Sequence, residues 1–130
     1  MNLKKIKSIC ISFLAILIIF YSPRTEAISH EWIAVPKSQY GEQLWDKKSL
    51  HKNQKGFLRV LSKFVPKTKT NITQEILYTM DINCSEKAFK DVAVGAKVFN
   101  EFENTDSEWK DPNGDKLILG VIDQVCEFIN

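Results

Sequence analysis

The chain has 130 residues, of which 44% are hydrophobic and 26% are charged, and its formal net charge is +2. This length and composition fit one ordinary globular domain and leave no room for a second. The first 27 residues hold four basic residues and one acidic residue, so the net charge of the remainder is about −1. A near-neutral domain lacks the broad basic surface that nucleic acids require, and we expect no nucleic-acid partner.

Residues 1–27 predict a secretory signal peptide. Three lysines precede a run of 13 residues, 9–21, that is apolar except for one serine. A membrane-spanning helix needs about 20 apolar residues, whereas a basic start, a short apolar core and small residues near the cut are typical of a signal peptide. We expect cleavage after Ala27, which leaves 28–130 as a single exported domain. A cut after Ser29, or retention of the segment as a membrane anchor, remains an alternative.

Export decides how the remaining cysteines are interpreted. Cys84 and Cys126 are the only two outside the predicted signal peptide, and exported proteins fold in an oxidising compartment. We therefore expect a structural disulfide between them, rather than a reactive thiol or a metal site. In the loop-closure model a link between such distant positions stabilises the folded chain by about 4 kcal/mol.

The first half of the domain alternates short apolar segments with turns. Residues 31–35 predict a strand that Pro36 ends, and residues 46–50 predict a polar connection with side chain to backbone bonds from its Asp and Ser. Residues 57–65 predict a further strand. Its apolar side chains face one way and its basic side chains face the other, with Leu58, Val60 and Phe64 opposed to Arg59 and Lys63.

The clearest strand is 76–84, where apolar residues recur at a strict period of two and place Cys84 on the buried side. Residues 92–98 predict another half-buried strand in which Gly95 marks a bulge. The polar stretch 85–90 would connect these two strands as an antiparallel pair.

The C-terminal segment predicts an amphipathic helix that covers the sheet. Asp111 is expected to cap it, with Pro112 at the first helical position and Asp115 in the first turn. The apolar stripe comprises Ile118, Val121, Ile122, Val125 and Ile129, flanked by Leu119 and Cys126. The residues expected to face water are Lys116, Gly120, Asp123 and Glu127. The predicted fold class is α+β: a meandering antiparallel β-sheet covered by a C-terminal α-helix, with one disulfide.

Taken in order, these segments resemble the bacterial surface-adhesin protein E-like domain family. The matching features are the Trp-led strand 32–35, the segment 45–50, which is similar to the family's aromatic-Asp-x-x-Ser-aliphatic signature, the strand 57–64, the segment 82–84, Trp109 before Pro112, and Val125 before Cys126. The chain departs from the family at the helix start, where 112–114 reads Pro-Asn-Gly instead of Pro-x-Ser.

The resemblance implies an antiparallel sheet with a helix, a Cys84–Cys126 bond and an exported or surface location. For the founding adhesin it implies binding to host matrix and plasma proteins, without a residue motif that carries over to this sequence.

The acidic segment 101–115 supports an alternative function, a small extracytoplasmic hydrolase or metal-dependent enzyme. Its acidic residues are Glu101, Glu103, Asp106, Glu108, Asp111 and Asp115. A calcium loop starting at Asp111 fails, because Gly114 is fourth where the EF-hand has its glycine sixth, and the twelfth residue is Ile122 instead of Glu. A pocket that gathers these carboxylates with His30 or His51 would favour the enzyme.

Two other groups of residues suggest binding. The lysines Lys52, Lys55, Lys63, Lys67 and Lys69 could form a patch for sulfated glycans or an acidic protein, although solvated loops are the commoner reading of such residues. Trp32, Trp45 and Trp109 could stack on sugars, but packing is the better expectation in a small domain.

These patterns together predict an exported, non-catalytic binding or envelope-associated module in the periplasm or at the cell surface. We expect no cofactor and no metal. The expected partner is a host or envelope protein, by resemblance, or a second copy in a homodimer. A membrane contact is expected only if the signal segment is retained.

Overall fold

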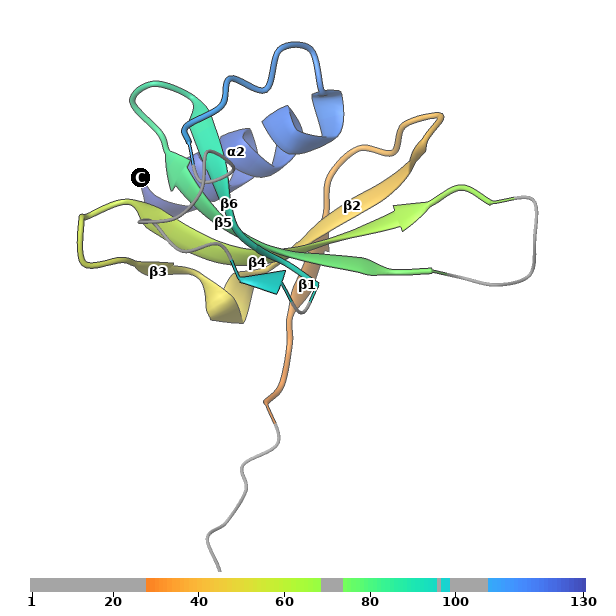
Figure 1. The fold of residues 1–130 in the computed structure, drawn as a ribbon, viewed down its shortest axis with the longest axis horizontal. Coiled ribbons are helices and arrows are strands. Elements are labelled where there is room, and N and C mark those ends of the chain that lie inside the picture. The colour runs from red at the N-terminus through yellow and green to blue at the C-terminus, as the bar shows by residue number, and fades with distance from the viewer. Residues whose placement is uncertain (1–27, 69–73, 96, 99–107) are drawn as a thin grey trace, which may run out of the picture.

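The computed structural model describes residues 28–68, 74–95, 97–98 and 108–130 (Figure 1). Within these residues the strands are β1 (Trp32–Ala34), β2 (Gly41–Asp46), β3 (His51–Lys52), β4 (Leu58–Pro66), β5 (Ile76–Asn83), β6 (Ala88–Val94) and β7 (Lys97–Val98). A 3₁₀-helix, η1 (Lys47–Ser49), follows β2, and an α-helix, α2 (Lys116–Ile129), ends the chain. The predicted signal peptide lies outside the described residues.

The strands form one antiparallel sheet in the order β1-β2-β4-β5-β6-β7, with β3 paired to β4. β2 and β3 lie along the same edge of β4, because η1 turns the chain between them. The turn is built as the sequence predicts: the Asp46 carboxylate accepts from the backbone N–H of Lys48 at 3.1 Å, and the Ser49 hydroxyl donates to the Asp46 carbonyl at 2.7 Å. The meandering antiparallel sheet is confirmed.

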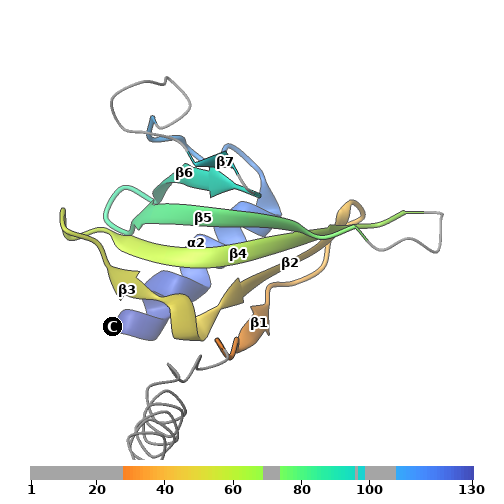
Figure 2. The same cartoon turned by 60° about the horizontal axis from the view of Figure 1, so that its bottom comes forward.

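The helix α2 covers one face of this sheet and lies behind β4 and β5 in Figure 2. The core between them consists of Val35, Trp45, Leu58, Val60, Met80, Ile82, Leu117, Val121, Ile122 and Val125, all at most 7% exposed. Because the apolar side chains of strands and helix are buried against each other, the predicted α+β architecture with its C-terminal helix is confirmed.

The helix begins four residues later than the sequence predicted. Its N-cap is Asp115, whose carboxylate accepts from the N–H groups of Leu117 and Ile118 at 3.0 and 3.2 Å. The Asp111 carboxylate instead accepts from the N–H of Asn113 at 2.8 Å. Asn113 and Gly114 have φ values of 41° and 84°, so the chain makes a left-handed turn there and cannot be helical from Pro112 onward.

The buried stripe of the helix is also rotated relative to the prediction. Val121, Ile122 and Val125 are buried as expected, but Ile129 is 44% exposed and Leu117 takes a place in the core. Gly120, expected to face water, is half-buried. It lies against β1's neighbour Val35, so close that a Cβ at Gly120 would be 3.1 Å from the Val35 Cβ.

The predicted strand 92–98 is two strands. Gly95, with φ of 57°, lies in the turn that separates β6 from β7, so it is not a bulge inside one strand. A register shift does occur nearby, but it lies between β5 and β6, at Thr79 and Met80. β6 already starts at Ala88, inside the stretch that was predicted as a connection.

The disulfide between Cys84 and Cys126 is confirmed, with an S–S distance of 1.98 Å and Cα atoms 5.7 Å apart. The burial predicted for Cys84 is wrong: the residue is exposed, because β5 ends at Asn83 and Cys84 begins the turn to β6. The bond therefore ties the β5–β6 turn to the last turns of α2.

Candidate binding face

The sheet has a second face that α2 does not cover, and its residues follow from the strand register. Trp45 packs in the core, and its direct partners are Ile33 on β1 and Ser62 on β4. Because alternate residues of a strand point to opposite faces, the neighbours of these residues point away from the helix. We call this second face the open face; it includes Lys63 and the apolar residues Trp32, Ala34, Leu44, Leu61, Val65, Leu77 and Ala93.

The open face carries apolar side chains on β1, β2 and β5, with Lys63 between them on β4. Ala34, Leu44, Lys63 and Leu77 lie directly opposite one another on β1, β2, β4 and β5. Leu77 is 41% exposed. Antiparallel sheets with one covered face normally show polar side chains on the other, and contiguous exposed apolar surface marks an interaction site in soluble proteins.

Lys63 is the cation at the centre of the open face. Its ammonium lies 4.5 Å from the centroid of the Trp32 ring and 3.1 Å from a carboxylate oxygen of Glu75. Only 16% of its side chain is exposed, because the Trp32 ring and the Glu75 carboxylate lie against its ammonium group. The face therefore presents apolar side chains together with a positive charge held in one place, and such charges contribute specificity to protein interfaces.

A buried ion pair borders the open face. Asp81 is fully buried, and its carboxylate accepts from Arg59 Nε at 2.7 Å, from Arg59 Nη2 at 2.9 Å and from Asn53 Nδ2 at 3.0 Å. Arg59 and Asp81 are direct partners on β4 and β5. The sequence did not predict this pair, because the alternation in each strand placed Arg59 and Asp81 on a solvent-facing side. Only the register of β4 against β5 brings them together.

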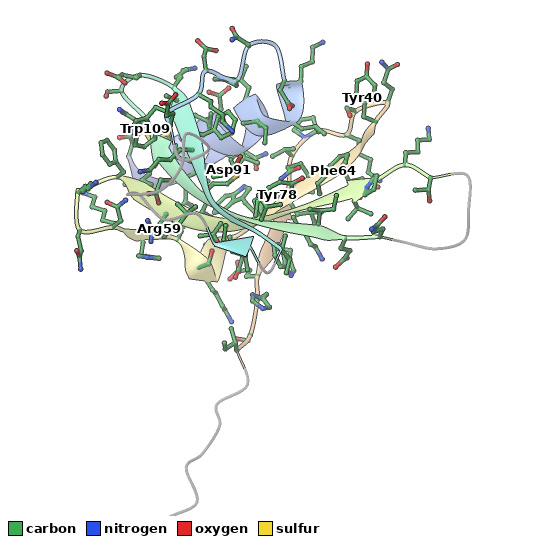
Figure 3. All side chains as sticks on the ribbon, in the orientation of Figure 1. Tyr40, Arg59, Phe64, Tyr78, Asp91 and Trp109 are labelled. Carbon is green, nitrogen blue, oxygen red and sulfur yellow. A yellow bond between two sulfur atoms is a disulfide. The ribbon has the colours of Figure 1, made fainter. Side chains whose placement is uncertain are left out.

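Aromatic residues continue this border. Trp109 and Phe57 pack edge to face with centroids 4.6 Å apart, and the Lys90 ammonium lies 5.4 Å from the Trp109 centroid. Figure 3 labels Arg59 and Trp109. Trp45 is buried, and Trp32 and Trp109 are half-buried beneath lysines, so the expectation of packing holds better than that of a sugar-stacking platform.

The two histidines have separate surroundings. His30 Nδ1 lies 2.8 Å from an oxygen of the buried Asp46 carboxylate, whereas His51 Nδ1 lies 2.7 Å from the Ser49 carbonyl oxygen. Burial alone would raise the pKa of Asp46, but hydrogen bonds from His30 and from backbone N–H groups outweigh it and hold the pKa below its ordinary value. Asp46 is thus a structural anchor for the start of β1.

The acidic segment gives the described structure no metal site. Asp111 and Asp115 hold the turn and the helix start, and no three His, Cys, Asp or Glu side chains in the described residues are grouped to hold a metal ion. Glu101, Glu103 and Asp106 lie outside the described residues. None of the contacts that the structure does describe favours the enzyme alternative.

One carboxyl on the helix side of the sheet has a raised pKa. Burial raises the pKa of Asp91, and the Lys110 ammonium, 3.7 Å away, offsets part of that effect. Burial and the Asp91 charge also raise the pKa of Tyr78. Both residues are labelled in Figure 3 and come from neighbouring strands, β6 and β5. Asp91 and Tyr78 therefore keep their protons to a higher pH than the free side chains do. No described contact places a nucleophilic side chain beside them.

The lysines do not form one patch. Lys52 pairs with Leu58 at the start of β4, and Lys63 lies five residues further along, which is about 17 Å in an extended strand. Lys67 follows the end of β4, and Lys69 lies outside the described residues. The basic side chains are therefore spread along the sheet.

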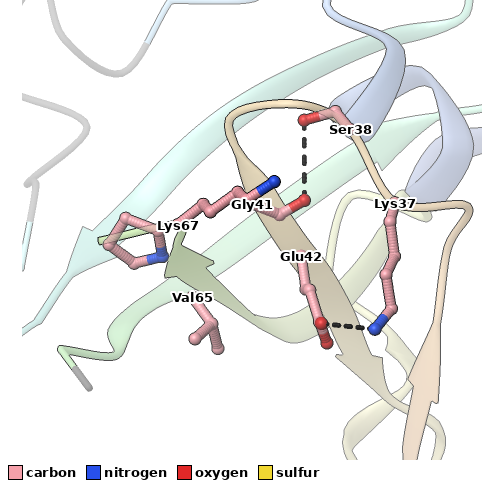
Figure 4. Close-up of a pocket in the computed structure, with 7 residues that line it drawn as sticks. Lys37, Ser38, Gly41, Glu42, Val65 and Lys67 are labelled. Carbon is pink, nitrogen blue, oxygen red and sulfur yellow. Dashed lines mark hydrogen bonds and ion pairs between the residues drawn. The ribbon is translucent and has the colours of Figure 1, made fainter. Parts of the chain in front are cut away.

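A surface hollow of about 410 Å³ lies where β2 begins and β4 ends (Figure 4). It is lined by Lys37, Ser38, Gly41, Glu42, Val65, Pro66 and Lys67. Lys37 and Glu42 pair with each other across it. Gly41 allows the two strands to approach, since a Cβ there would be 2.3 Å from the Val65 carbonyl oxygen. The described contacts of its polar side chains, Lys37 with Glu42 and Ser38 with Gly41, thus lie within the connection that leads into β2.

Comparison with known proteins identifies one family. A family model described as the surface adhesin-E family matches residues 33–130. No curated protein and no solved structure matches the chain. Among the described residues, no helix is long and apolar enough to cross a membrane.

Proposed function

The chain belongs to the surface adhesin-E family, and from this membership and the open face we propose that it is a non-catalytic surface module that binds a protein partner. The proposal includes export, with removal of residues 1–27, and a final location at the cell surface or in the periplasm.

The observation that supports this proposal is the apolar open face. Leu77, Trp32 and Leu61 belong to three strands of one sheet and are absent from the described core. A partner that covers them gains the hydrophobic contribution of roughly 25 cal/mol per Å² of apolar surface removed from water. Lys63 within the face and the partly exposed Arg59 at its border supply charge that selects among partners.

A substitution on the open face tests the proposal. The oxidised protein with Leu77→Asp is compared with wild type in capture from the native cell envelope and from host extracellular matrix. Leu77 is exposed, so the change preserves the fold, and circular dichroism checks this. We expect the capture of the partner to weaken at least tenfold.

The matched control is Tyr40→Asp, which places the same charge on a side chain that is 70% exposed and lies in the turn before β2. Capture that falls equally with both variants, or with neither, contradicts binding through the open face. Sedimentation of wild type and Leu77→Asp identifies the case in which the partner is a second copy of the chain.

A further inference from the structure

The molecule has a second exposed apolar surface, at the end where the chain enters the sheet. Ile28 is 84% exposed, and Phe128 and Ile129 in the last turn of α2 are 52% and 44% exposed. Lys47 and Lys48 of η1 lie between them in contact with both segments. We call these five residues the stem surface. In Figure 2 the C-terminus and the start of β1 both lie along the bottom of the view, whereas Figure 1 shows them apart; the lysines of η1 connect them, through Lys47 to Phe128 and through Lys48 to Ser29.

The chain before β1 is fixed to η1 by several bonds. Lys48 Nζ donates to the Ser29 hydroxyl at 2.9 Å, Lys47 Nζ lies 3.3 Å from a Glu31 carboxylate oxygen, and the Lys47 N–H donates to the Glu31 carbonyl at 2.9 Å. With the His30 contact to Asp46, each residue of 29–31 is held. The described chain therefore meets residues 1–27 at the stem surface, and six residues, 22–27, separate the end of the apolar run from Ile28.

The chain outside the described residues indicates what this surface meets. Residues 1–27 combine three lysines with a 13-residue apolar run, and such a segment inserts into a lipid bilayer whether it is later cleaved or kept. While it is attached, the short connection 22–27 keeps Ile28 within about 25 Å of the end of the apolar run, and so keeps the stem surface near that bilayer. Exposed aromatic and aliphatic side chains beside lysines are the groups that bind the boundary between headgroups and acyl chains.

We propose that the stem surface docks on an anionic phospholipid membrane. Phe128, Ile129 and Ile28 enter the interfacial layer. The Lys47 ammonium, 5.1 Å from the Phe128 ring centroid, lies at the level of the headgroups. Glu31 offsets the charge of Lys47, and Glu127 lies on the same end of α2, so the apolar side chains supply most of the binding and Lys48 supplies the preference for anionic lipid. The open face and the β2 turn then remain accessible from outside.

Hydrogen–deuterium exchange tests this docking on the exported protein, whose N-terminus is first determined by intact mass. The protein is incubated with phosphatidylcholine vesicles that either contain or lack phosphatidylglycerol. We expect added protection at residues 47–49 and 126–130, stronger with phosphatidylglycerol, and no change at residues 38–41. Co-sedimentation without that protection overturns the proposal. The same protection at high protein concentration without vesicles also overturns it, because the surface would then bind protein.

Variants give a second readout by vesicle co-sedimentation. Phe128→Ser with Ile129→Ser should weaken binding about tenfold, and Lys48→Gln should weaken binding to anionic vesicles about fivefold while leaving neutral vesicles unaffected. Ile129→Ser alone keeps the contact of Phe128 with Trp45 and serves if the double variant is unstable. The control Leu77→Ser should bind vesicles as wild type does. Capture of the protein partner through the open face is expected to survive all stem variants, so the two proposals fail separately.

Discussion

The indole N–H of Trp45 on β2 donates a 2.8 Å hydrogen bond to Gln124 Oε1 on α2. The amide nitrogen of Gln124 then donates to the Ala34 carbonyl oxygen on β1 at 3.3 Å. One helix side chain thus satisfies the polar group of a tryptophan that is 1% exposed and connects the helix to two strands. The position of α2 over β1 and β2 depends on this contact as well as on apolar packing.

Replacing Gln124 should destabilise the domain for that reason. Gln124→Leu leaves the buried indole N–H without its acceptor, and we expect the free energy of unfolding to fall by about 1–3 kcal/mol in urea titrations. Adding Trp45→Phe removes the orphaned donor, so the double variant should lose less than the sum of the single losses. Glu127 is exposed, and Glu127→Gln is the control. If Gln124→Leu and Glu127→Gln have the same small effect on the free energy of unfolding, the hydrogen bond does not have this role.

The disulfide should be a major source of stability. Cys84→Ser together with Cys126→Ser opens a loop with a sequence separation of 42 residues, and we expect a loss of about 4 kcal/mol. The measurement is the melting temperature under non-reducing conditions. Wild type in excess reductant should melt at the temperature of the double variant. A melting temperature that the substitutions leave unchanged would rule the bond out as a stabilising link.

The Arg59–Asp81 pair should respond unequally to removal of its two members. Asp81 is fully buried, whereas the Arg59 side chain is 31% exposed. Arg59→Met leaves a buried carboxylate without its guanidinium, and we expect a loss of about 3–5 kcal/mol. Asp81→Asn should cost less, because the guanidinium can turn to water. Chemical unfolding of both variants measures this. A larger loss of unfolding free energy for Asp81→Asn would contradict the expectation that the buried carboxylate needs its partner more than the guanidinium does.

Asp91 should make the domain less stable as the pH rises. Since burial raises the pKa of Asp91 above its ordinary 3.8, the folded chain binds this proton more tightly than the unfolded chain does. Its ionisation therefore opposes folding above the raised pKa and has no effect well below 3.8. Asp91→Asn should be more stable than wild type near neutral pH, and the difference should vanish as the pH falls below 3.8.

Asp46 provides the opposite case for the same unfolding series. Its pKa is lowered, so its contribution to stability is present above 3.8 and is lost as the pH falls through the lowered value. Asp46→Asn should accordingly be less stable than wild type at neutral pH. If both Asn variants shift stability in the same direction, the assignment of these two environments is wrong.

Local patterns predicted the elements whose causes are local. The period-two strand around Met80 and Ile82, the turn at Asp46 and Ser49, and the pairing of the two cysteines all follow from neighbouring residues or from a count. The helix start failed because Asp111-Pro112 and Asp115 are both suitable caps. The deciding signal was Asn113-Gly114, since that pair favours the left-handed conformation and ends any helix begun before it.

The open face could not be predicted in the same way. β1 and β2 each carry adjacent apolar residues, Trp32 beside Ile33 and Leu44 beside Trp45, so alternation does not say which one faces the helix. Contacts distant in sequence decide it, above all the bond from Trp45 to Gln124. The same holds for Arg59 and Asp81, which become partners only through the register of β4 and β5.

The Cys84–Cys126 bond also determines what happens to the chain when a protease cuts it. Every peptide bond between the two cysteines belongs to a covalently closed loop. Hydrolysis of one such bond opens the loop but releases no fragment, and α2 stays tethered to the strand that precedes Cys84. The nicked protein keeps its mass, plus one water, and both halves of its core remain attached until a reductant separates them.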